Sequence, residues 1–313
     1  MAEFALPDFP EVSRGVLREI SRRHGLEGRA TSPLPEVGIF NRIYSLGEDL
    51  FLRVPRDHPA FVAAARKEAV AVPAAREAGV RTPAMVAFDD TGDLLPVPYS
   101  IFDRVRGETL GLLDLGPADV PETWKELGRD LARLHAGVPE DGPAAGLELE
   151  AVPDPRLWPD ALAAEGYFSN AEARWLSAWL ECLAPAALAP VSGRFLHGDS
   201  QATNVMVQRR TLEYEAVLDW GGSGWGDPAW DFAGVPLRVV PSMLDGYRGV
   251  APLAANETAE ARILWRDLQL SLYLMRRDPQ PGRSWAERPL GMVLEVTRFL
   301  LGSPGERWSR WTP

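Results

Sequence analysis

Three oxygen-bearing side chains have the order and spacing of a site that transfers a phosphoryl group. Asp199 and Asn204 stand five residues apart after a short apolar segment, and Asp219 directly follows the apolar run 216–218. Kinase catalytic loops show the same D-x-x-x-x-N register, in which the aspartate receives the proton of the acceptor hydroxyl and the asparagine binds Mg²⁺. Asp219 stands where a second metal-binding carboxylate is expected. The spacing therefore predicts a catalytic Asp199, with Mg²⁺ bound by Asn204 and Asp219.

The same segments carry a family resemblance. The letters HGD at 197–199, together with Asn204, match the H-G-D-x-x-x-x-N loop of the aminoglycoside phosphotransferase-like kinases. LDW at 218–220 matches their apolar-Asp-Trp motif, and GDPAWDFA at 226–233 matches their G-D-P-A-x-D-L-A segment. In combination these motifs are specific to the family, so the chain resembles this group of relatives of the protein kinases.

The resemblance implies a fold and a reaction. The fold would be α+β and bilobal, protein kinase-like, with a nucleotide-binding lobe over residues 1–105 and a larger helical lobe over 106–313. The reaction would move the γ-phosphoryl group of ATP or GTP, with Mg²⁺, to the hydroxyl of a small molecule. An antibiotic, such as an aminoglycoside or a macrolide, is the expected acceptor. Choline, homoserine and amino sugars are the alternatives that related metabolite kinases suggest.

Composition narrows the classes of partner. A net charge of −11 argues against nucleic acid, whose phosphates require basic patches. The same acidity is compatible with a cationic substrate, and equally with a role in solubility alone. Cys182 is the only cysteine, which excludes an internal disulfide. No apolar run approaches the roughly 20 residues of a membrane span, and the first residues lack a signal-peptide pattern. We therefore expect a cytoplasmic monomer or homodimer.

Hydrophobic patterns predict the elements that position these residues. In the first third, strands are predicted at 38–46, 50–54 and 97–105, and helices at 8–24 and 60–78. Asp8 would cap the first helix, and Pro73 would kink or split the second.

Beyond residue 107 the pattern becomes mostly helical. Capping-box signatures mark two helix starts, at Asp119 with Glu122 and at Ser169 with Glu172. Two more helices are predicted near 256–276 and 285–301, and residues 138–160 read as a loop. A strand-rich first third followed by a helical remainder predicts an α+β architecture with a cleft at the junction.

On the nucleotide side, strand alternation puts Phe51 and Arg53 on one face of the strand 50–54. The resemblance implies that Phe51 packs on the nucleobase and that Arg53, in place of the usual lysine, reaches the phosphates. Arginine keeps the charge and binds phosphate bidentately. Glu68 on the following helix is the predicted partner of Arg53, with a solvated helix face as the alternative.

Two more segments are expected to contact the nucleotide. The loop 38–41 has one glycine, unlike G-x-G-x-x-G, and its backbone would approach the phosphates with the help of Asn41. In the hinge 102–105, backbone groups of Asp103 and Val105 would face the nucleobase. Such backbone contacts do not distinguish ATP from GTP, so both donors remain predicted.

Three residues are expected to support the site. His197 is interpreted as a hydrogen-bonding residue that holds the loop, and a catalytic role is the weaker reading. Asp227 and Asp231 are interpreted as supports, with Asp231 as the cap of a helix beginning at Phe232.

Other functions are opposed by the sequence to different degrees. Four histidines without metal-ligand spacing disfavour a zinc hydrolase, and the absence of G-x-S-x-G disfavours a serine hydrolase. No A-P-E-type activation segment supports a protein kinase. A pseudokinase that binds nucleotide without catalysis stays open, because Arg53 and the one-glycine loop favour it while the intact trio of Asp199, Asn204 and Asp219 opposes it.

Overall fold

A five-stranded antiparallel sheet forms the first part of the chain, with strand order β1-β2-β3-β5-β4. Its strands are β1 (Thr31–Pro33), β2 (Asn41–Leu46), β3 (Leu50–Pro55), β4 (Met85–Asp89) and β5 (Tyr99–Asp103). Side chains along β3 alternate between buried and half-buried, as the sequence predicted. The strands predicted at 38–46 and 50–54 correspond to β2 and β3, which pair as a hairpin. The computed structural model describes residues 6–35, 40–113, 115, 119–278 and 288–313.

One face of this sheet is covered by helix α1 (Arg14–Arg23). Leu17 and Ile20 of α1 are buried in the same apolar cluster as Leu52 and Ile101 of the sheet. Burial of one such aliphatic side chain contributes about 1.5–3 kcal/mol. This small core is separate from a larger one that spans the rest of the chain.

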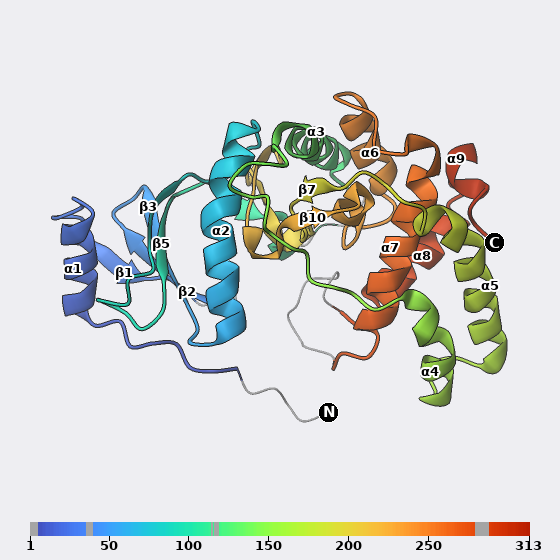
Figure 1. The fold of residues 1–313 in the computed structure, drawn as a ribbon, viewed down its shortest axis with the longest axis horizontal. Helices are drawn as coiled ribbons and strands as arrows, with labels where there is room; N and C mark the ends of the chain where they lie inside the picture. Colours follow the sequence, from blue (N-terminus) through green and yellow to red (C-terminus); the bar gives the residue numbers. More distant parts are fainter. Residues whose placement is uncertain (1–5, 36–39, 114, 116–118, 279–287) are drawn as a thin grey trace.

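Helix α2 (Pro59–Glu77) lies between the sheet and the helical body and joins the two cores (Figure 1). Val62 packs on the small core, whereas Val72 and Ala75 belong to the large one. The middle of α2 packs against the short 3-10 helix η4 (Trp220–Gly222). A residue on this face of α2 can therefore reach the segment that contains Asp219.

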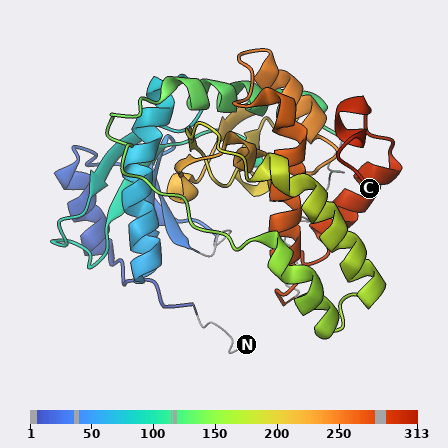
Figure 2. The same cartoon turned by 45° about the vertical axis from the view of Figure 1, so that its right-hand side comes forward.

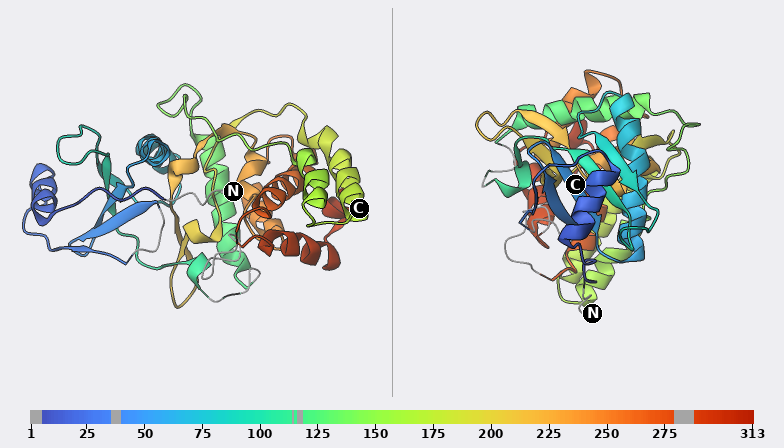
Figure 3. Two further views of the ribbon diagram at one scale, coloured as in Figure 1. Left: turned by 90° about the horizontal axis from the view of Figure 1, so that it is seen from below. Right: turned by 90° about the vertical axis from the view of Figure 1, so that its left-hand side faces the viewer.

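The larger body is mainly helical, and it lies beside the sheet along the long axis of the molecule (Figure 3). Its α-helices are α3 (Pro121–Gly137), α4 (Trp158–Ala164), α5 (Asn170–Ala187), α6 (Val240–Arg248), α7 (Ala259–Leu274), α8 (Gly291–Leu301) and α9 (Glu306–Ser309). Helix α5 packs against both α4 and α7 (Figure 2). This arrangement confirms the predicted α+β architecture.

Short strands within the helical body flank the segments that contain Asp199, Asn204 and Asp219. β8 (Val205–Val207) pairs with both β6 (Glu108–Thr109) and β9 (Tyr214–Val217), and β7 (Arg194–Leu196) pairs with β10 (Gly224–Gly226). All of these pairings are antiparallel.

Two glycines let α3 and α6 cross at close range. A Cβ atom on Gly128 would lie 1.9 Å from the carbonyl oxygen of Met243, and one on Gly246 would lie 2.0 Å from that of Lys125. No side chain fits at either position. The contact holds α3 directly against α6.

Some predicted elements differ in their ends. Helix α1 begins at Arg14, not near residue 8, because the hydroxyl of Ser13 accepts a hydrogen bond from Val16 and caps it. The chain before it contains Pro10, which disfavours helical backbone at the preceding residue. Helix α2 continues through Pro73 without a break, so the predicted split is wrong.

The two predicted capping boxes have opposite outcomes. The box of Ser169 with Glu172 is present at the start of α5. The box of Asp119 with Glu122 is absent, because the N-cap position of α3 is Val120 and no side chain caps it. Residues 138–160 are less irregular than predicted, since they include the 3-10 helix η2 (Pro155–Leu157) and the start of α4.

Helices α7 and α8 match the two predicted near the end of the chain, although both start later than expected. Residues 285–287 of the predicted last helix lie outside the described residues. In the described part of the chain, no helix combines the length and apolar character needed to cross a membrane.

Candidate active site

The two chain segments of the predicted site are joined through their backbones. Strand β8 begins directly after Asn204 and pairs with β9, which leads to Asp219. The backbone N–H of Leu218 donates to the carbonyl oxygen of Asn204 at 2.8 Å. Since Asp219 follows Leu218 directly, the two predicted metal ligands leave neighbouring backbone segments.

Asp199 and Asn204 are linked by their side chains. Asn204 Nδ2 donates to the backbone oxygen of Asp199 at 2.8 Å and to Asp199 Oδ2 at 2.9 Å. Gln201 Nε2 donates to the same Oδ2 at 3.2 Å. These bonds fix the orientation of the carboxylate and turn the amide nitrogen of Asn204 towards it. The remaining oxygen, Asn204 Oδ1, accepts no hydrogen bond from the described residues and is a neutral ligand for a cation.

Asp219 has an unusual backbone conformation, with φ at +66°. Left-handed backbone at a residue other than glycine is uncommon and is concentrated at functional sites. The side chain of Asp219 is 40% exposed, and its Oδ1 lies 3.7 Å from Arg53 Nη2. The carboxylate is therefore accessible and faces the guanidinium of Arg53 on β3.

The predicted ion pair between Arg53 and Glu68 is present. Arg53 Nη1 donates to Glu68 Oε1 at 2.6 Å, and the Glu68 side chain is only 6% exposed. The alternative of a solvated helix face for Glu68 is therefore wrong. Burial acts to lower the pKa of Arg53, but the carboxylates of Glu68 and Asp219 outweigh it and raise that pKa. Arg53 is a stable cation that connects the sheet, α2 and the segment of Asp219.

His197 lies under the loop with a fully buried ring. Its Nε2 is 2.9 Å from the carbonyl oxygen of Leu218, and its Nδ1 accepts the backbone N–H of Asp199 at 3.2 Å. Burial lowers the pKa of His197, which favours the neutral ring with the proton on Nε2. The ring also meets Trp220 edge-on at 4.5 Å between centroids. His197 thus joins Asp199 to the segment of Asp219, in the position that its predicted supporting role requires.

Asp231 does not cap a helix that begins at Phe232, because Phe232 ends the 3-10 helix η5 (Pro228–Phe232). The buried carboxylate of Asp231 instead accepts the backbone N–H groups of His197 at 2.9 Å and Gly198 at 2.7 Å. His135 Nε2 of α3 lies 2.9 Å from the same carboxylate. Burial acts to raise the pKa of Asp231, but these hydrogen bonds and nearby histidines outweigh it and lower that pKa.

Gly198 is required by this geometry. Its φ is +84°, and a Cβ atom would lie 2.2 Å from the carbonyl oxygen of Gly222. The close contact brings the loop of Asp199 against η4, which follows Asp219. The glycine in the middle of the His-Gly-Asp motif is therefore required for steric reasons.

Asp227 caps η5 and pairs with α7. Its Oδ1 accepts the backbone N–H of Ala229 at 2.9 Å and is also in contact with the guanidinium of the fully buried Arg262. The carboxylate thus anchors the segment after β10 to helix α7.

The other predicted nucleotide contacts lie on the sheet. Phe51 is half-buried on the same side of β3 as Arg53, and the Arg104 guanidinium lies 5.1 Å from its ring centroid. Asn41 opens β2, two residues before Ile43, the cross-strand partner of Arg53. Gly38 and Ile39 of the predicted phosphate loop lie outside the described residues.

The hinge residues follow β5. The backbone N–H of Asp103 donates to Ala84 at 2.9 Å, so this N–H does not face a nucleobase. Any contact from Asp103 has to use its other atoms. Val105 is half-buried just beyond the strand. The roles of both residues stay predictions.

Sequence reasoning missed three residues that hold the loop in place: Gln201 and Trp230 directly, and His135 through Asp231. Gln201 holds Asp199 Oδ2, and Trp230 Nε1 donates to the carbonyl oxygen of Gly198 at 3.2 Å. The available signal for His135 was its place as a polar residue near the end of α3, next to the apolar side chains that this helix buries. Neither of the others had a spacing that pointed to a role.

The donor set suits a hard cation that shares its ligands with a substrate. Among the described residues, no group of three or more histidine, cysteine, aspartate or glutamate side chains could hold a metal alone. Mg²⁺ is usually bound by one or two carboxylates together with water and phosphate oxygens. Asp219 and Oδ1 of Asn204 fit this requirement.

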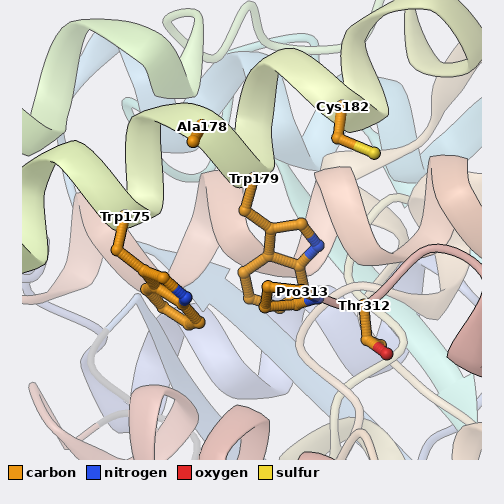
Figure 4. Close-up of a pocket in the computed structure, with 6 residues that line it drawn as sticks. All are labelled: Trp175, Ala178, Trp179, Cys182, Thr312 and Pro313. Atoms are coloured by element: carbon orange, nitrogen blue, oxygen red, sulfur yellow. The ribbon is translucent and has the colours of Figure 1, made fainter.

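A hollow elsewhere on the surface does not belong to this site. Trp175, Trp179 and Cys182 of α5 line it together with Thr312 and Pro313 (Figure 4). Its volume is about 140 Å³, below the roughly 300–1,000 Å³ of ligand pockets. A hollow of this volume is too small to hold the substrate of the site around Asp199.

Solved structures share the fold at low sequence identity. A GDP complex of a mutant aminoglycoside 2'-phosphotransferase-IIIa aligns with a TM-score of 0.62 and 17% identity, over 92% of this chain and 97% of that one. A choline/ethanolamine kinase family protein from Mesorhizobium loti gives 0.59 and 18%, over 95% and 97%. Macrolide 2'-phosphotransferase MphH from Brachybacterium faecium gives 0.57 and 21%, over 94% and 96%.

These likenesses establish the kinase-like, two-lobed fold that the motifs predicted. No curated protein sequence matches the chain. The family model described as the phosphotransferase enzyme family matches residues 34–269, which include strands β2 to β5 of the sheet, α2, the loop of Asp199 and most of α7. The match covers most of the sequence, and the protein belongs to this phosphotransferase family.

Proposed function

We propose that the protein transfers the γ-phosphoryl group of ATP or GTP to the hydroxyl of a small molecule, with Mg²⁺. The observation that carries the proposal is the linkage of Asp199, Asn204 and Asp219 at the junction of the two lobes. Asn204 bonds Asp199 through its side chain and the strand of Asp219 through its backbone. Arg53 reaches the same place from the sheet.

Each side chain has a distinct task in this reaction. Asp199, oriented by the amides of Gln201 and Asn204, positions the acceptor hydroxyl and receives its proton. The hydroxyl oxygen forms the new bond to phosphorus while the bond to the nucleoside diphosphate breaks. Asn204 and Asp219 would hold Mg²⁺, which neutralises charge on the phosphate oxygens when bound. Arg53 adds a fixed positive charge on the sheet side.

For the nucleotide itself, the proposal keeps the predicted contacts. Phe51 packs on the nucleobase, the backbones of Asp103 and Val105 meet its edge, and Asn41 approaches the phosphates. GDP complexes of the aminoglycoside phosphotransferase support a guanine donor beside ATP.

The acceptor is a hydroxylated small molecule, with antibiotics as the first candidates. Support comes from solved relatives described as complexes with kanamycin and gentamicin and from the macrolide phosphotransferase. The choline/ethanolamine kinase family protein supports the metabolite kinase as the alternative. A non-catalytic nucleotide-binding protein is the third reading, favoured by arginine in place of lysine at position 53.

Replacement of Asp199 by asparagine tests the reaction. Asp199→Asn keeps the shape of the side chain but removes its ability to accept a proton, so kcat should fall by about 10²–10⁴-fold. The measurement is release of ADP or GDP with a panel of aminoglycosides, macrolides, choline and amino sugars, with and without EDTA. Binding of the nucleotide should change little in the variant.

Asp245→Asn, at an exposed position on α6, is the matched control. It should turn over at the wild-type rate. Equal turnover by Asp199→Asn would rule out the assigned base. Mg²⁺-dependent nucleotide binding without turnover of any acceptor would favour the non-catalytic reading.

A further inference from the structure

Helix α7 brings a guanidinium close to the catalytic loop. The Arg266 side chain lies over the ring of Trp230, with 5.7 Å between its Cζ and the ring centroid. Trp230 in turn donates to the carbonyl oxygen of Gly198, the residue before Asp199. Arg266 is therefore one side chain away from the loop, and α7 packs against η5, which contains Trp230.

A second contact, one helical turn further along α7, leads to the same loop. Gly234, with φ at +77°, leaves space that Leu270 and Gln201 border: a Cβ there would lie 3.5 Å from Leu270 Cδ2 and 3.7 Å from Gln201 Cβ. Gln201 is the residue that bonds Asp199 Oδ2. Both half-buried side chains, Arg266 and Leu270, thus lie next to residues that belong to or contact the loop of Asp199.

Arg266 has more donors than partners. A guanidinium carries five N–H donors. Nη1 donates to Gln269 Oε1 at 3.0 Å, whereas Nη2 is 3.8 Å from Asp227 Oδ2, beyond hydrogen-bond length. The buried Nε has no hydrogen-bond partner within the described parts of the chain. Unsatisfied buried donors are costly, and a side chain that is still 23% exposed is accessible to a ligand that would satisfy them.

The cluster of Asp227, Arg262 and Arg266 carries a net positive charge although the chain is acidic overall. Asp227 is shared by two guanidinium groups, and the fully buried Arg262 is in direct contact with its Oδ1. Arg262 and Asp227 neutralise each other, which leaves the charge of Arg266. Burial lowers the pKa of Arg266, and Arg262 adds to this fall while Asp227 opposes it. An arginine nevertheless stays protonated.

The surface next to Arg266 is apolar and aromatic. Leu270 and the exposed Tyr273 follow Arg266 at helical spacing on α7. Trp158 of α4 lies 6.2 Å from the Tyr273 ring, centroid to centroid. The surface of α7 beside the loop therefore combines one cation with a stripe of apolar side chains.

We propose that Arg266 binds an oxyanion of the acceptor, a carboxylate or a phosphate, while an apolar part of the same molecule lies along Leu270 and Tyr273. The inference rests on the proposed function and narrows its substrate class. The acceptor is an amphipathic anion with a free hydroxyl. A polycationic aminoglycoside is disfavoured, because its ammonium groups would meet Arg266 as like charges.

Binding of matched probes tests this without any need for turnover. The anionic probes are phenyl β-D-glucuronide and the 6-phosphate of phenyl β-D-glucoside. The neutral and cationic probes are phenyl β-D-glucoside and phenyl β-D-glucosaminide. Calorimetric titration of the wild-type protein should show at least one anion binding about tenfold more tightly than both other probes, the size of one charge-assisted hydrogen bond. The two anions distinguish carboxylate from phosphate.

Variants then assign the preference to one residue. Arg266→Gln should abolish it, and Arg266→Lys should keep part of it. Arg18→Gln removes the same charge from an exposed position on α1, in the sheet lobe, and should leave the preference intact. Thermal unfolding and nucleotide binding confirm that each variant is folded; Arg266→Lys serves if Arg266→Gln does not fold. No anion preference in the wild type, or full retention in both Arg266 variants, would overturn the proposal.

The outcome separates this inference from the proposed function. Anion preference that depends on Arg266, without phosphoryl transfer to any acceptor, would keep the binding site and refute the reaction. Phosphorylation of the glucosaminide with the same kcat/KM by wild type and Arg266→Gln would keep the reaction and refute the anionic acceptor.

Discussion

The loop of Asp199 and the part of the site around Arg53 are built in different ways. Around Asp199 the loop is held by many bonds: two backbone N–H groups donate to Asp231, and His197, Asn204 and Trp230 each bond its backbone. Around Arg53 the structure depends on one buried ion pair and a longer contact to Asp219. One region has redundant support, and the other depends mainly on one ion pair.

The proposed reaction would account for the difference. Proton transfer from an acceptor hydroxyl requires heavy atoms within hydrogen-bond reach, so small displacements of Asp199 are costly. A cation that neutralises phosphate acts over a longer range and tolerates displacement. We therefore expect the loop to be a rigid unit and the Arg53 side to adapt when nucleotide binds.

The largest expected effect comes from Asp231→Ala. The change removes a buried charge and leaves the N–H groups of His197 and Gly198 without their acceptor. Breaking a buried charged network of this kind costs about 3–5 kcal/mol. Urea unfolding should show this loss in the free energy of unfolding, and kcat should fall as the loop loses its position.

Asp245→Ala on the exposed face of α6 is the control for loss of an aspartate and should change stability little. If Asp231→Ala proved as stable as this control, the loop would not depend on its buried carboxylate. The contrast between the two regions would then fail.

A smaller effect is expected from Arg53→Met. Glu68 loses its partner, but a buried carboxyl can take up a proton, so the cost should be about 1–3 kcal/mol. The Kd for nucleotide with Mg²⁺ should rise at least about tenfold, since a charge-assisted contact to phosphate is lost. Isothermal titration with ATP and GTP measures it.

Arg53→Lys sharpens the same test. Lysine restores the charge found at this place in kinases, and nucleotide binding should stay within about tenfold of wild type. Weaker binding by Arg53→Lys than by Arg53→Met would contradict a role that rests on charge. A destabilisation by Arg53→Met larger than that by Asp231→Ala would reverse the comparison.

The sequence predicted those parts of the site that are close together along the chain. Asp199, Asn204 and Asp219 lie within one strand–loop–strand segment, and Glu68 is 15 residues from Arg53 on the next helix. In such segments, strand alternation and helix direction determine which side chains face each other. The motifs, read through the family they resemble, and the Arg53–Glu68 pair could therefore be predicted from residues that lie near one another in the chain.

What the sequence could not supply are contacts made across the fold. His135 reaches Asp231 over 96 residues, and Arg266 meets the loop only through Trp230. Local sequence rules also gave one wrong prediction. An aspartate just before an expected helix is predicted to cap that helix, but the carboxylate of Asp231 instead accepts hydrogen bonds from three donors in other segments. Such choices depend on tertiary packing, which no spacing reveals.

The smallest effect in the comparison is a pH dependence that belongs to the loop alone. Burial holds the pKa of His197 below its ordinary value of about 6.5. Below about pH 6.5 the unfolded chain therefore binds a proton at this ring that the folded chain does not bind. The free energy of unfolding decreases as pH falls below about 6.5 towards the folded pKa, by at most about 1.4 kcal/mol per pH unit. Urea unfolding between pH 8 and 5 should show a shallower fall for His197→Gln. His24→Gln is the control, because its half-buried ring, whose pKa is also lowered by burial, should remove a smaller part of the slope. A His197→Gln curve parallel to that of the wild type would mean that the buried ring is not what makes the loop sensitive to acid.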